Sequence, residues 1–195
     1  MSDGPAPMVG VPLETISVGD SAEIARTVSQ RDIAGFVEAV GDYNPVHSDR
    51  AYAARTMFRE PIAPGIWTAG LISAVIGTRL PGPGAIYLSQ DLRFHKAVKL
   101  GDVIRARVQV VETNREKNRM RLSTVCTNQR GEDVLTGEAL VMPPRTRVVY
   151  DGRVAPAAAW TLWPLAPWGW AAQMWSLWVA AGLSAWPGSG ASRAG

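Results

Sequence analysis

The chain contains two histidines, and one of them, His47, follows an acidic residue, Asp42, by five positions. Imidazole gains and loses a proton close to neutral pH, so a histidine near a carboxylate is a candidate for acid–base catalysis. An interpretation without chemistry also fits this segment. Asp and Asn favour turns and helix caps for local reasons, so Asp42 and Asp49 can simply cap the helices on either side of an Asn44-Pro45 turn.

An apolar stretch, residues 64–80, follows this segment and predicts the helix around which the fold is organised. Its apolar residues fall at all angles of a helical wheel, as is typical of a helix that is buried on every side. The stretch is shorter than the roughly 20 apolar residues that cross a bilayer. Pro64 suits a helix start, because the first N–H has no intrahelical partner, and the Pro/Gly-rich residues 80–84 end the helix.

The residues after this helix predict the sheet on which it packs. Four strand-like runs cover residues 85–94, 103–114, 119–128 and 133–142. Within residues 104–110 apolar and polar side chains alternate strictly, as in a strand with one wet face. The short polar connections at 116–118 and 129–132 predict antiparallel neighbours. His95, directly after the first run, is expected to be a strand-edge residue.

The residues before the Asp42 segment predict one strand and one helix. Residues 22–28 alternate weakly, as in a strand. Ser29 followed by Asp32 matches the capping-box pattern at a helix start, and Gly41 can end that helix. One enclosed helix and an antiparallel sheet together predict an α+β fold.

Length and composition exclude several classes of protein. The 195 residues can form a domain with a real core, and nothing indicates a second core. The 20 basic and 17 acidic side chains are interspersed, so nucleic-acid binding is disfavoured. Cys126 is the only cysteine, which rules out an intrachain disulfide and indicates a reducing compartment. The first residues lack the basic start and apolar run of a secretory signal, so we expect a cytoplasmic location.

The two ends of the chain differ in composition from its middle. Residues 1–12, rich in Gly and Pro, are expected to be a flexible leader, and residues 13–145 form the expected domain. In the tail, residues 146–195, no charge lies between Arg153 and Arg193, and seven of the eight Trp residues lie there. Residues 168–186 are long enough to consider as a membrane span, but Gln173, Ser176 and the glycines weaken that interpretation. We favour a poorly ordered or loosely docked extension; a cut-short fusion or an out-of-frame read is an alternative.

Several blocks in unbroken order resemble the MaoC-like (R)-specific enoyl-CoA hydratases. These blocks are Gly41 to His47, Pro61 to Gly65, Leu80 to Tyr87, Phe94, and Gly101-Asp102. The resemblance runs from about residue 16 to residue 142, and its Asp-x-Asn-Pro-x-His element is fairly specific. It implies the hotdog fold, in which an antiparallel sheet wraps around a long central helix. It also implies a homodimer that binds acyl-CoA near the subunit interface and adds water to a trans-2-enoyl-CoA, giving an (R)-3-hydroxyacyl-CoA without a metal or redox cofactor.

The resemblance also implies roles for five residues. Asp42 and His47 match the catalytic acid–base pair, and the backbone N–H of Gly65 matches the donor to the thioester oxygen. Ser73 matches a serine near the pair and is given a supporting role, although a small packing residue is an equally good interpretation. Asn44, inside the same motif as the pair, is assigned to substrate binding.

Two positions depart from the family pattern, and the function leaves alternatives open. Pro64 stands where the family commonly has His, and Ala97-Val98 stands where it has Pro-Val. A dehydratase working in reverse would use the same site. A hotdog thioesterase would use a carboxylate without the histidine, and a non-catalytic acyl-CoA-binding subunit would need neither. Acyl chain length is expected to depend on crowding beside the helix, with Trp67, Ile72 and Ile76 as candidates.

Overall fold

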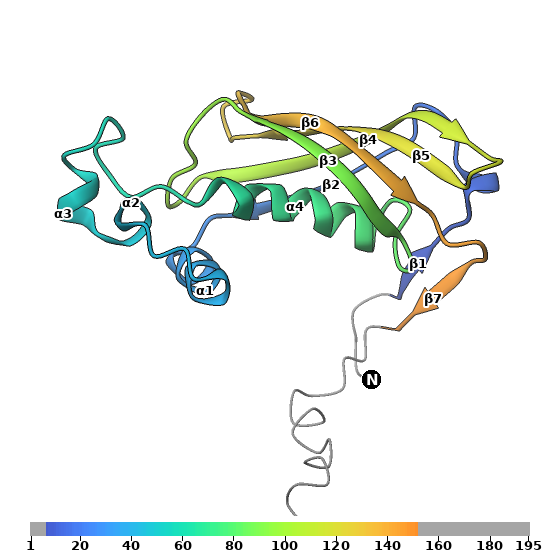
Figure 1. The fold of residues 1–195 in the computed structure, drawn as a ribbon, viewed down its shortest axis with the longest axis horizontal. Helices are drawn as coiled ribbons and strands as arrows, with labels where there is room; N and C mark the ends of the chain where they lie inside the picture. Colours follow the sequence, from blue (N-terminus) through green and yellow to red (C-terminus); the bar gives the residue numbers. More distant parts are fainter. Residues whose placement is uncertain (1–6, 152–195) are drawn as a thin grey trace, which may run out of the picture. The chain divides into compact units, whose positions relative to one another are not determined.

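The computed structural model describes residues 7–151, and in them a five-stranded antiparallel sheet curves around one long helix (Figure 1). The strand order is β2-β4-β5-β6-β3, so β2 and β3 form the two edges of the sheet. The strands of this sheet are β2 (Ser21–Thr27), β3 (Ile86–Phe94), β4 (Val103–Asn114), β5 (Arg119–Thr127) and β6 (Asp133–Met142). The helices are α1 (Gln30–Val40), α2 (Pro45–Ser48), α3 (Arg50–Ala53) and α4 (Gly65–Thr78), preceded by a 3-10 turn at Leu13–Thr15. The predicted α+β architecture is confirmed, and all four predicted strands after the central helix are present.

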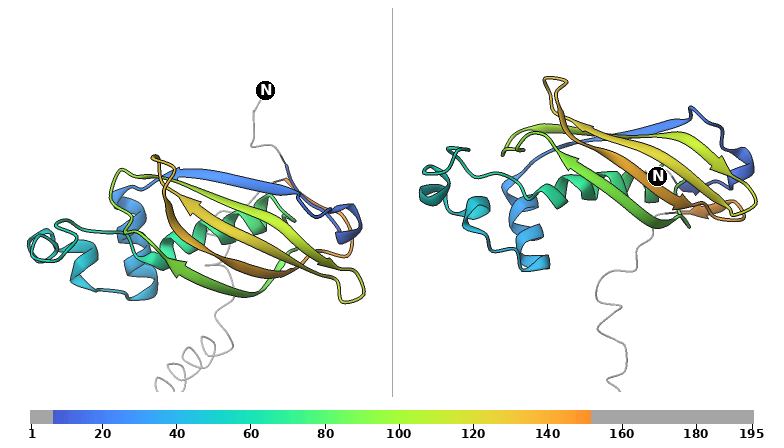
Figure 2. Two further views of the ribbon diagram at one scale, coloured as in Figure 1. Left: turned by 90° about the horizontal axis from the view of Figure 1, so that it is seen from above. Right: turned by 45° about the horizontal axis from the view of Figure 1, so that its top comes forward.

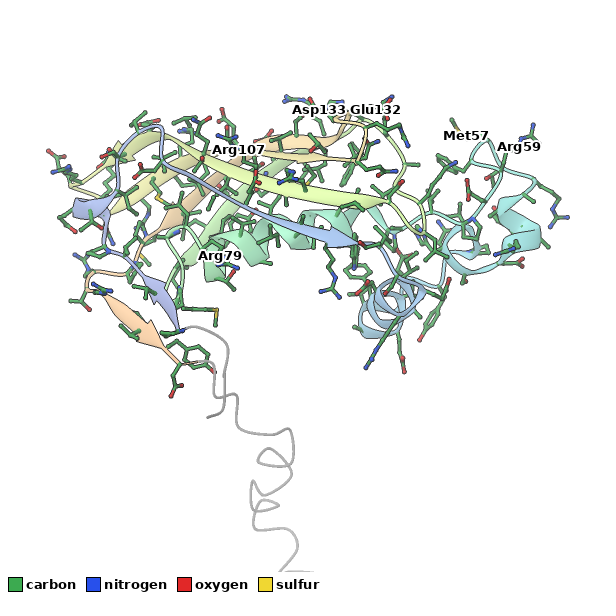
Figure 3. All side chains as sticks on the ribbon, turned by 180° about the vertical axis from the view of Figure 1, so that it is seen from behind. Met57, Arg59, Arg79, Arg107, Glu132 and Asp133 are labelled. Carbon is green, nitrogen blue, oxygen red and sulfur yellow. The ribbon has the colours of Figure 1, made fainter. Side chains whose placement is uncertain are left out.

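The core lies between α4 and the concave face of the sheet (Figure 2). Leu71, Ile72, Val75 and Ile76 of α4 are buried there. The strict alternation predicted for residues 104–110 places Ile104, Ala106, Val108 and Val110 of β4 in the same core. Each fully buried Val, Leu or Ile side chain contributes about 1.5–3 kcal/mol to folding. The intervening Arg107 lies on the opposite face of the sheet (Figure 3).

Within residues 7–151 the central helix is not enclosed on every side, contrary to the expectation from its composition. Ile66 is 56% exposed, and Gly70, Ser73 and Gly77 form an exposed stripe with it. The sheet covers only one face of α4, and a helical wheel reports how apolar each face is, not what covers it.

Helix α1 begins and ends where the sequence predicts. Its capping box is formed: the Asp32 N–H donates to Ser29 Oγ, and the Ser29 N–H donates to the Asp32 carboxylate at 3.0 Å. Gly41 ends the helix in the left-handed conformation, at φ 75°, which costs glycine least. The chain then turns directly into the segment that carries Asp42.

Two further strands join residues assigned to the leader and the tail. β1 (Met8–Gly10) pairs antiparallel with β7 (Val148–Tyr150). The expected domain limits, 13 and 145, therefore leave out a pair of strands that the structure places together. Composition gave no sign of this pairing, because each strand is three residues long and its partner is distant in sequence. A Cβ added to Gly10 would lie 1.8 Å from the Pro83 carbonyl oxygen, so only glycine fits there.

No helix within residues 7–151 is long and apolar enough to cross a membrane. The segment 168–186, which we considered as a membrane span, lies outside the described residues. The same holds for the expected poor order of the tail beyond residue 151.

Candidate active site

His47 is held by the backbone of the loop that leads into α4. Its Nδ1 lies 2.8 Å from the Ile62 carbonyl oxygen, and the Ile62 N–H donates to the Val46 carbonyl at 3.2 Å. A carbonyl oxygen can only accept, so Nδ1 carries the proton and Nε2 of the neutral ring has a free lone pair. The residue is 8% exposed. Burial and the Ile62 contacts therefore fix both the orientation and the tautomer of the imidazole.

Asp42 faces the free nitrogen of this ring. Its Oδ2 lies 3.6 Å from His47 Nε2, and its side chain is 43% exposed. This separation is longer than a direct hydrogen bond of about 2.7–3.2 Å, but it lets one water molecule contact both atoms. The sequence predicted that these two side chains converge, and the structure brings them together.

Gly65 is the first residue of α4 and follows Pro64, whose extended backbone (φ −57°, ψ 134°) turns the chain into the helix. The first N–H groups of a helix have no intrahelical partner. Among residues 7–151 we find no hydrogen bond from the Gly65 N–H. A Cβ at this position would lie 2.8 Å from the Phe94 ring, which packs directly on the glycine. Gly65 therefore offers a backbone donor at the positive end of the helix dipole.

Asn44 and Ser73, the other two predicted site residues, are both exposed. The Asn44 side chain accepts from the Val46 N–H at 3.3 Å and so caps α2, which positions His47. Ser73 lies on the exposed stripe of α4. The roles predicted for them in substrate binding stay predictions.

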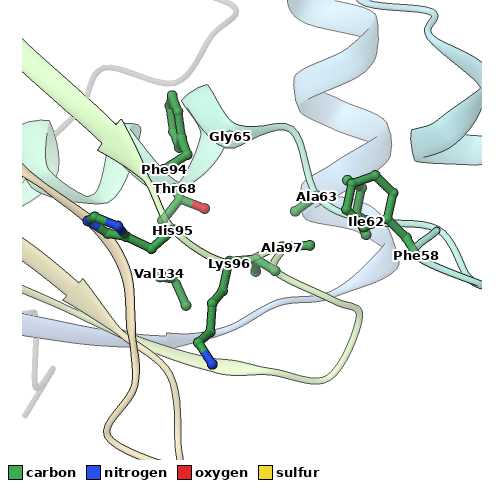
Figure 4. Close-up of a pocket in the computed structure, with 11 residues that line it drawn as sticks. Phe58, Ile62, Ala63, Gly65, Thr68, Phe94, His95, Lys96, Ala97 and Val134 are labelled. Atoms are coloured by element: carbon green, nitrogen blue, oxygen red, sulfur yellow. The ribbon is translucent and has the colours of Figure 1, made fainter.

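Two cavities flank the segment between α2 and α4. The first cavity, about 280 Å³, lies beside the start of α4 and is lined by residues that include Phe58, Ile62, Gly65, Thr68, Phe94 and Val98 (Figure 4). The second cavity, about 290 Å³, is lined by His47 together with Arg50, Arg59 and Glu60 among others. Ile62 lines the first cavity and bonds to the histidine of the second, whereas Asp42 lines neither. Gly65 and His47 thus face neighbouring cavities.

Three lining residues were missed or only partly foreseen from the sequence. His95 lies after β3 as expected, with Nε2 2.7 Å from Thr136 Oγ1, but it also lines the first cavity. Phe94 was noted only as part of the family pattern. Thr68 is not among the predicted site residues, although its hydroxyl lies three residues after Gly65 in a mostly apolar helix.

Other groups in the described chain are poor candidates for chemistry. Burial raises the pKa of the Cys126 thiol to about 12, so it is not a thiolate nucleophile at neutral pH. Burial also raises the pKa of Tyr87 to about 12. No cluster of three or more His, Cys, Asp or Glu side chains within residues 7–151 has the spacing of a metal site.

Comparison with known proteins identifies the family. The family model described as MaoC like domain matches residues 16–131, more than half of the chain. The chain belongs to the MaoC-like family. That assignment agrees with the motif at 41–47 and with the hotdog arrangement of sheet and helix.

The relatives of this MaoC-like protein include enzymes and solved structures. It is 48% identical over 132 residues to the 3-hydroxybutyryl-CoA dehydratase of Methylorubrum extorquens, covering 68% of this chain and 83% of that protein. It is 47% identical over 131 residues to the (R)-specific enoyl-CoA hydratase of Rhodospirillum rubrum, covering 67% and 90%. The unliganded R-hydratase of Pseudomonas aeruginosa superposes with a TM-score of 0.73 at 43% identity, covering 77% of this chain and 97% of that one.

Proposed function

We propose that this MaoC-like protein is an (R)-specific enoyl-CoA hydratase, which adds water to a trans-2-enoyl-CoA to give an (R)-3-hydroxyacyl-CoA. The observation that carries the proposal is the pairing of His47 Nε2 with Asp42 Oδ2 at 3.6 Å, while Nδ1 is bound to the Ile62 carbonyl. The relatives named as hydratase and dehydratase support the same reaction, which is reversible.

The pair can carry out both proton transfers of the reaction. A water molecule between the two side chains donates one hydrogen bond to Nε2 and one to the carboxylate. As its oxygen bonds to Cβ, its proton passes to Nε2, and the electrons of the double bond move toward the thioester. The imidazolium, stabilised by Asp42, then returns a proton for the new C–H bond at Cα. The neutral histidine is regenerated, so no further reactant is needed.

Electron density that builds on the thioester oxygen needs a fixed donor. The Gly65 N–H meets that need, because it is unpaired among the described residues and lies at a helix N-terminus. Pro64, in place of the family histidine, leaves this N–H in place. The proposal therefore assigns water activation to Asp42 and His47, and oxyanion stabilisation to Gly65.

One assay separates hydratase from the alternative functions. The purified protein is mixed with crotonyl-CoA, and the ultraviolet absorbance of the conjugated thioester is followed alongside the release of free thiol. A hydratase removes the conjugation without releasing thiol. Release of thiol would indicate a thioesterase, and no change in either signal would favour a non-catalytic acyl-CoA-binding subunit. Product chirality with enoyl-CoA substrates of several lengths then tests stereochemistry and chain-length preference.

We also propose that the protein is a homodimer that pairs along β3. This edge strand exposes three large apolar side chains: Ile86 at 50%, Leu88 at 40% and Phe94 at 53%. An exposed apolar edge strand is a template for pairing with another chain. The exposed stripe of α4 offers further surface for a second copy. The cytoplasmic location expected from the sequence stays a prediction.

A further inference from the structure

Thr68 carries the one buried side-chain polar atom without a hydrogen-bond partner among the described residues. Its Oγ1 is enclosed, and the whole residue is 2% exposed. A buried hydroxyl left without a partner loses its hydration without compensation, so such groups are rare and call for an explanation. The backbone carbonyl of Thr68 already accepts from the Cys126 thiol at 3.8 Å, so only the side chain lacks a partner.

Thr78, the other threonine of α4, makes the local hydrogen bond that Thr68 lacks. Thr78 Oγ1 donates to the carbonyl of Ala74, one turn earlier, at 2.6 Å. This local bond is the ordinary way in which a helical threonine satisfies its hydroxyl. The corresponding carbonyl for Thr68 is that of Pro64, which accepts from the Trp67 N–H but makes no hydrogen bond with Thr68 Oγ1. The two threonines are thus a matched pair within one helix, one satisfied internally and one not.

The Thr68 hydroxyl points toward the first cavity, at the same end of α4 as Gly65 (Figure 4). A helical side chain leans toward the N-terminus, so Thr68 lies over the turn that starts at Gly65. The rest of the lining is mostly apolar and includes Phe94 and Val134, while His95 and Lys96 are its polar members. A polar ligand atom that enters here finds the Thr68 hydroxyl as a donor close to the helix N-terminus.

We propose that the Thr68 hydroxyl donates a hydrogen bond to a carbonyl oxygen of the bound acyl thioester in the first cavity. The inference rests on the proposed acyl-CoA substrate and adds a substrate-binding residue to it. The carbonyl belongs either to the thioester itself, beside the Gly65 N–H, or to the nearest amide of the pantetheine arm. Both sources present the same acceptor, and kinetics distinguish them.

The test compares Thr68→Val, which is isosteric but lacks the hydroxyl, with Thr68→Ser, which keeps it. Thr78→Val is the matched control, because it removes the hydroxyl that the helix itself uses. Each variant is assayed with crotonyl-CoA and with the S-ethyl thioester of crotonic acid, which has no amide. Thermal unfolding and calorimetric binding of butyryl-CoA, a saturated thioester that cannot be hydrated, are measured on the same proteins.

We expect Thr68→Val to lower kcat/KM with crotonyl-CoA by about 10- to 100-fold, within the range for loss of one donor. Thr68→Ser should stay within a few-fold of the wild type. If the acceptor is the thioester carbonyl, kcat falls with both substrates. If it is the amide, KM rises with crotonyl-CoA alone. The melting temperature of Thr68→Val should equal or exceed that of the wild type, whereas Thr78→Val should melt earlier at unchanged kcat.

Wild-type kcat and KM for Thr68→Val with both substrates would overturn the inference. A loss of stability like that of Thr78→Val would also overturn it, because it would show that the hydroxyl is bonded within the folded protein. Failure of the proposed hydratase function looks different, since the wild type would then leave crotonyl-CoA unchanged. Binding of butyryl-CoA still tests Thr68 in that case: equal affinity of the wild type and Thr68→Val contradicts the inference.

Discussion

At the scale of single residues, the Ile62 carbonyl orients the His47 ring, and Asp42 follows the left-handed Gly41 that ends α1. Ile62 contacts α2 through its N–H and the imidazole through its carbonyl. The family resemblance predicted that Asp42 and His47 meet, whereas their spacing alone also fitted helix caps and a turn. Their separation, and the Ile62 carbonyl that sets the tautomer, could not be predicted, because that contact joins residues 15 positions apart. The unpaired state of Thr68 likewise depends on what surrounds it in space.

Replacement of either member of the pair should abolish most of the activity. We expect Asp42→Asn or His47→Ala to lower kcat by roughly 10² to 10⁴, the range for loss of general acid–base catalysis. Steady-state hydration of crotonyl-CoA measures the effect. Glu116→Gln, in the exposed turn between β4 and β5, is the control and should match the wild type. A near-normal kcat in Asp42→Asn or His47→Ala would remove the assignment.

The role of the Gly65 N–H can be tested separately from the steric clash that any side chain at this position makes with Phe94. In a Phe94→Ala background, which removes the ring that a Cβ would strike, Gly65→Ala keeps the N–H and Gly65→Pro deletes it. Proline is compatible with the first helical position, so the helix should still start there. We expect kcat for the proline variant to be about 10²-fold or more below that of the alanine variant, the cost of one oxyanion donor. Equal kcat values would exclude this N–H as the donor.

At the scale of elements, local signals predicted most boundaries. The capping box, the left-handed Gly41 and the alternation in β4 are all written in neighbouring residues, and all three are confirmed. The exposed stripe of α4 was not foreseen, because whether a face is covered depends on other elements. The pairing of β1 with β7 escaped prediction for the same reason. Helix α1 matters for function because Asp42 directly follows Gly41, the residue that ends this helix.

The capping box should make stability depend on pH in acid. Hydrogen bonds from Ser29 and Arg26 lower the pKa of Asp32 from 3.8 to about 2 in the folded protein. Its charge therefore stabilises the fold above pH 4 or so, and this contribution is lost as the pH falls through about 2. We expect Asp32→Asn to lower the free energy of unfolding by about 1 kcal/mol at pH 7 and by little at pH 2. Urea unfolding at several pH values measures it; a difference that is constant with pH would mean that the charge is not responsible.

At the scale of the whole molecule, residues 7–151 expose apolar side chains along the β3 edge and on one face of α4. Such a surface indicates contact with another protein chain. Ile66, Ile86 and Leu88 are exposed among the described residues, and the dimer that we propose would bury apolar surface of this kind. The resemblance predicted a homodimer, whereas composition and periodicity could not, because neither records which apolar residues stay exposed after folding. The same limit applies to the two cavities, whose walls come from segments distant in sequence.

Charge placed on the β3 edge should separate the copies. We expect the double variant Ile86→Lys/Leu88→Lys to elute from size exclusion at half the mass of the wild type, because like charges would face each other across the pair. Val18→Lys, at a position 63% exposed in the loop before β2, is the control and should leave the mass unchanged. Elution of the wild type itself as a monomer at micromolar concentration would contradict the proposed dimer.

Ile62 holds His47 through its backbone carbonyl alone, and the same residue lines the first cavity. Proton handling and the shape of the acyl-binding wall are therefore separable in this protein. Trimming Ile62 to Val or Ala should remodel the preference among enoyl chains, read out as relative kcat/KM across lengths, without moving the pH profile of turnover. In this protein, one lining position can therefore change the substrate preference while the acid–base pair stays the same.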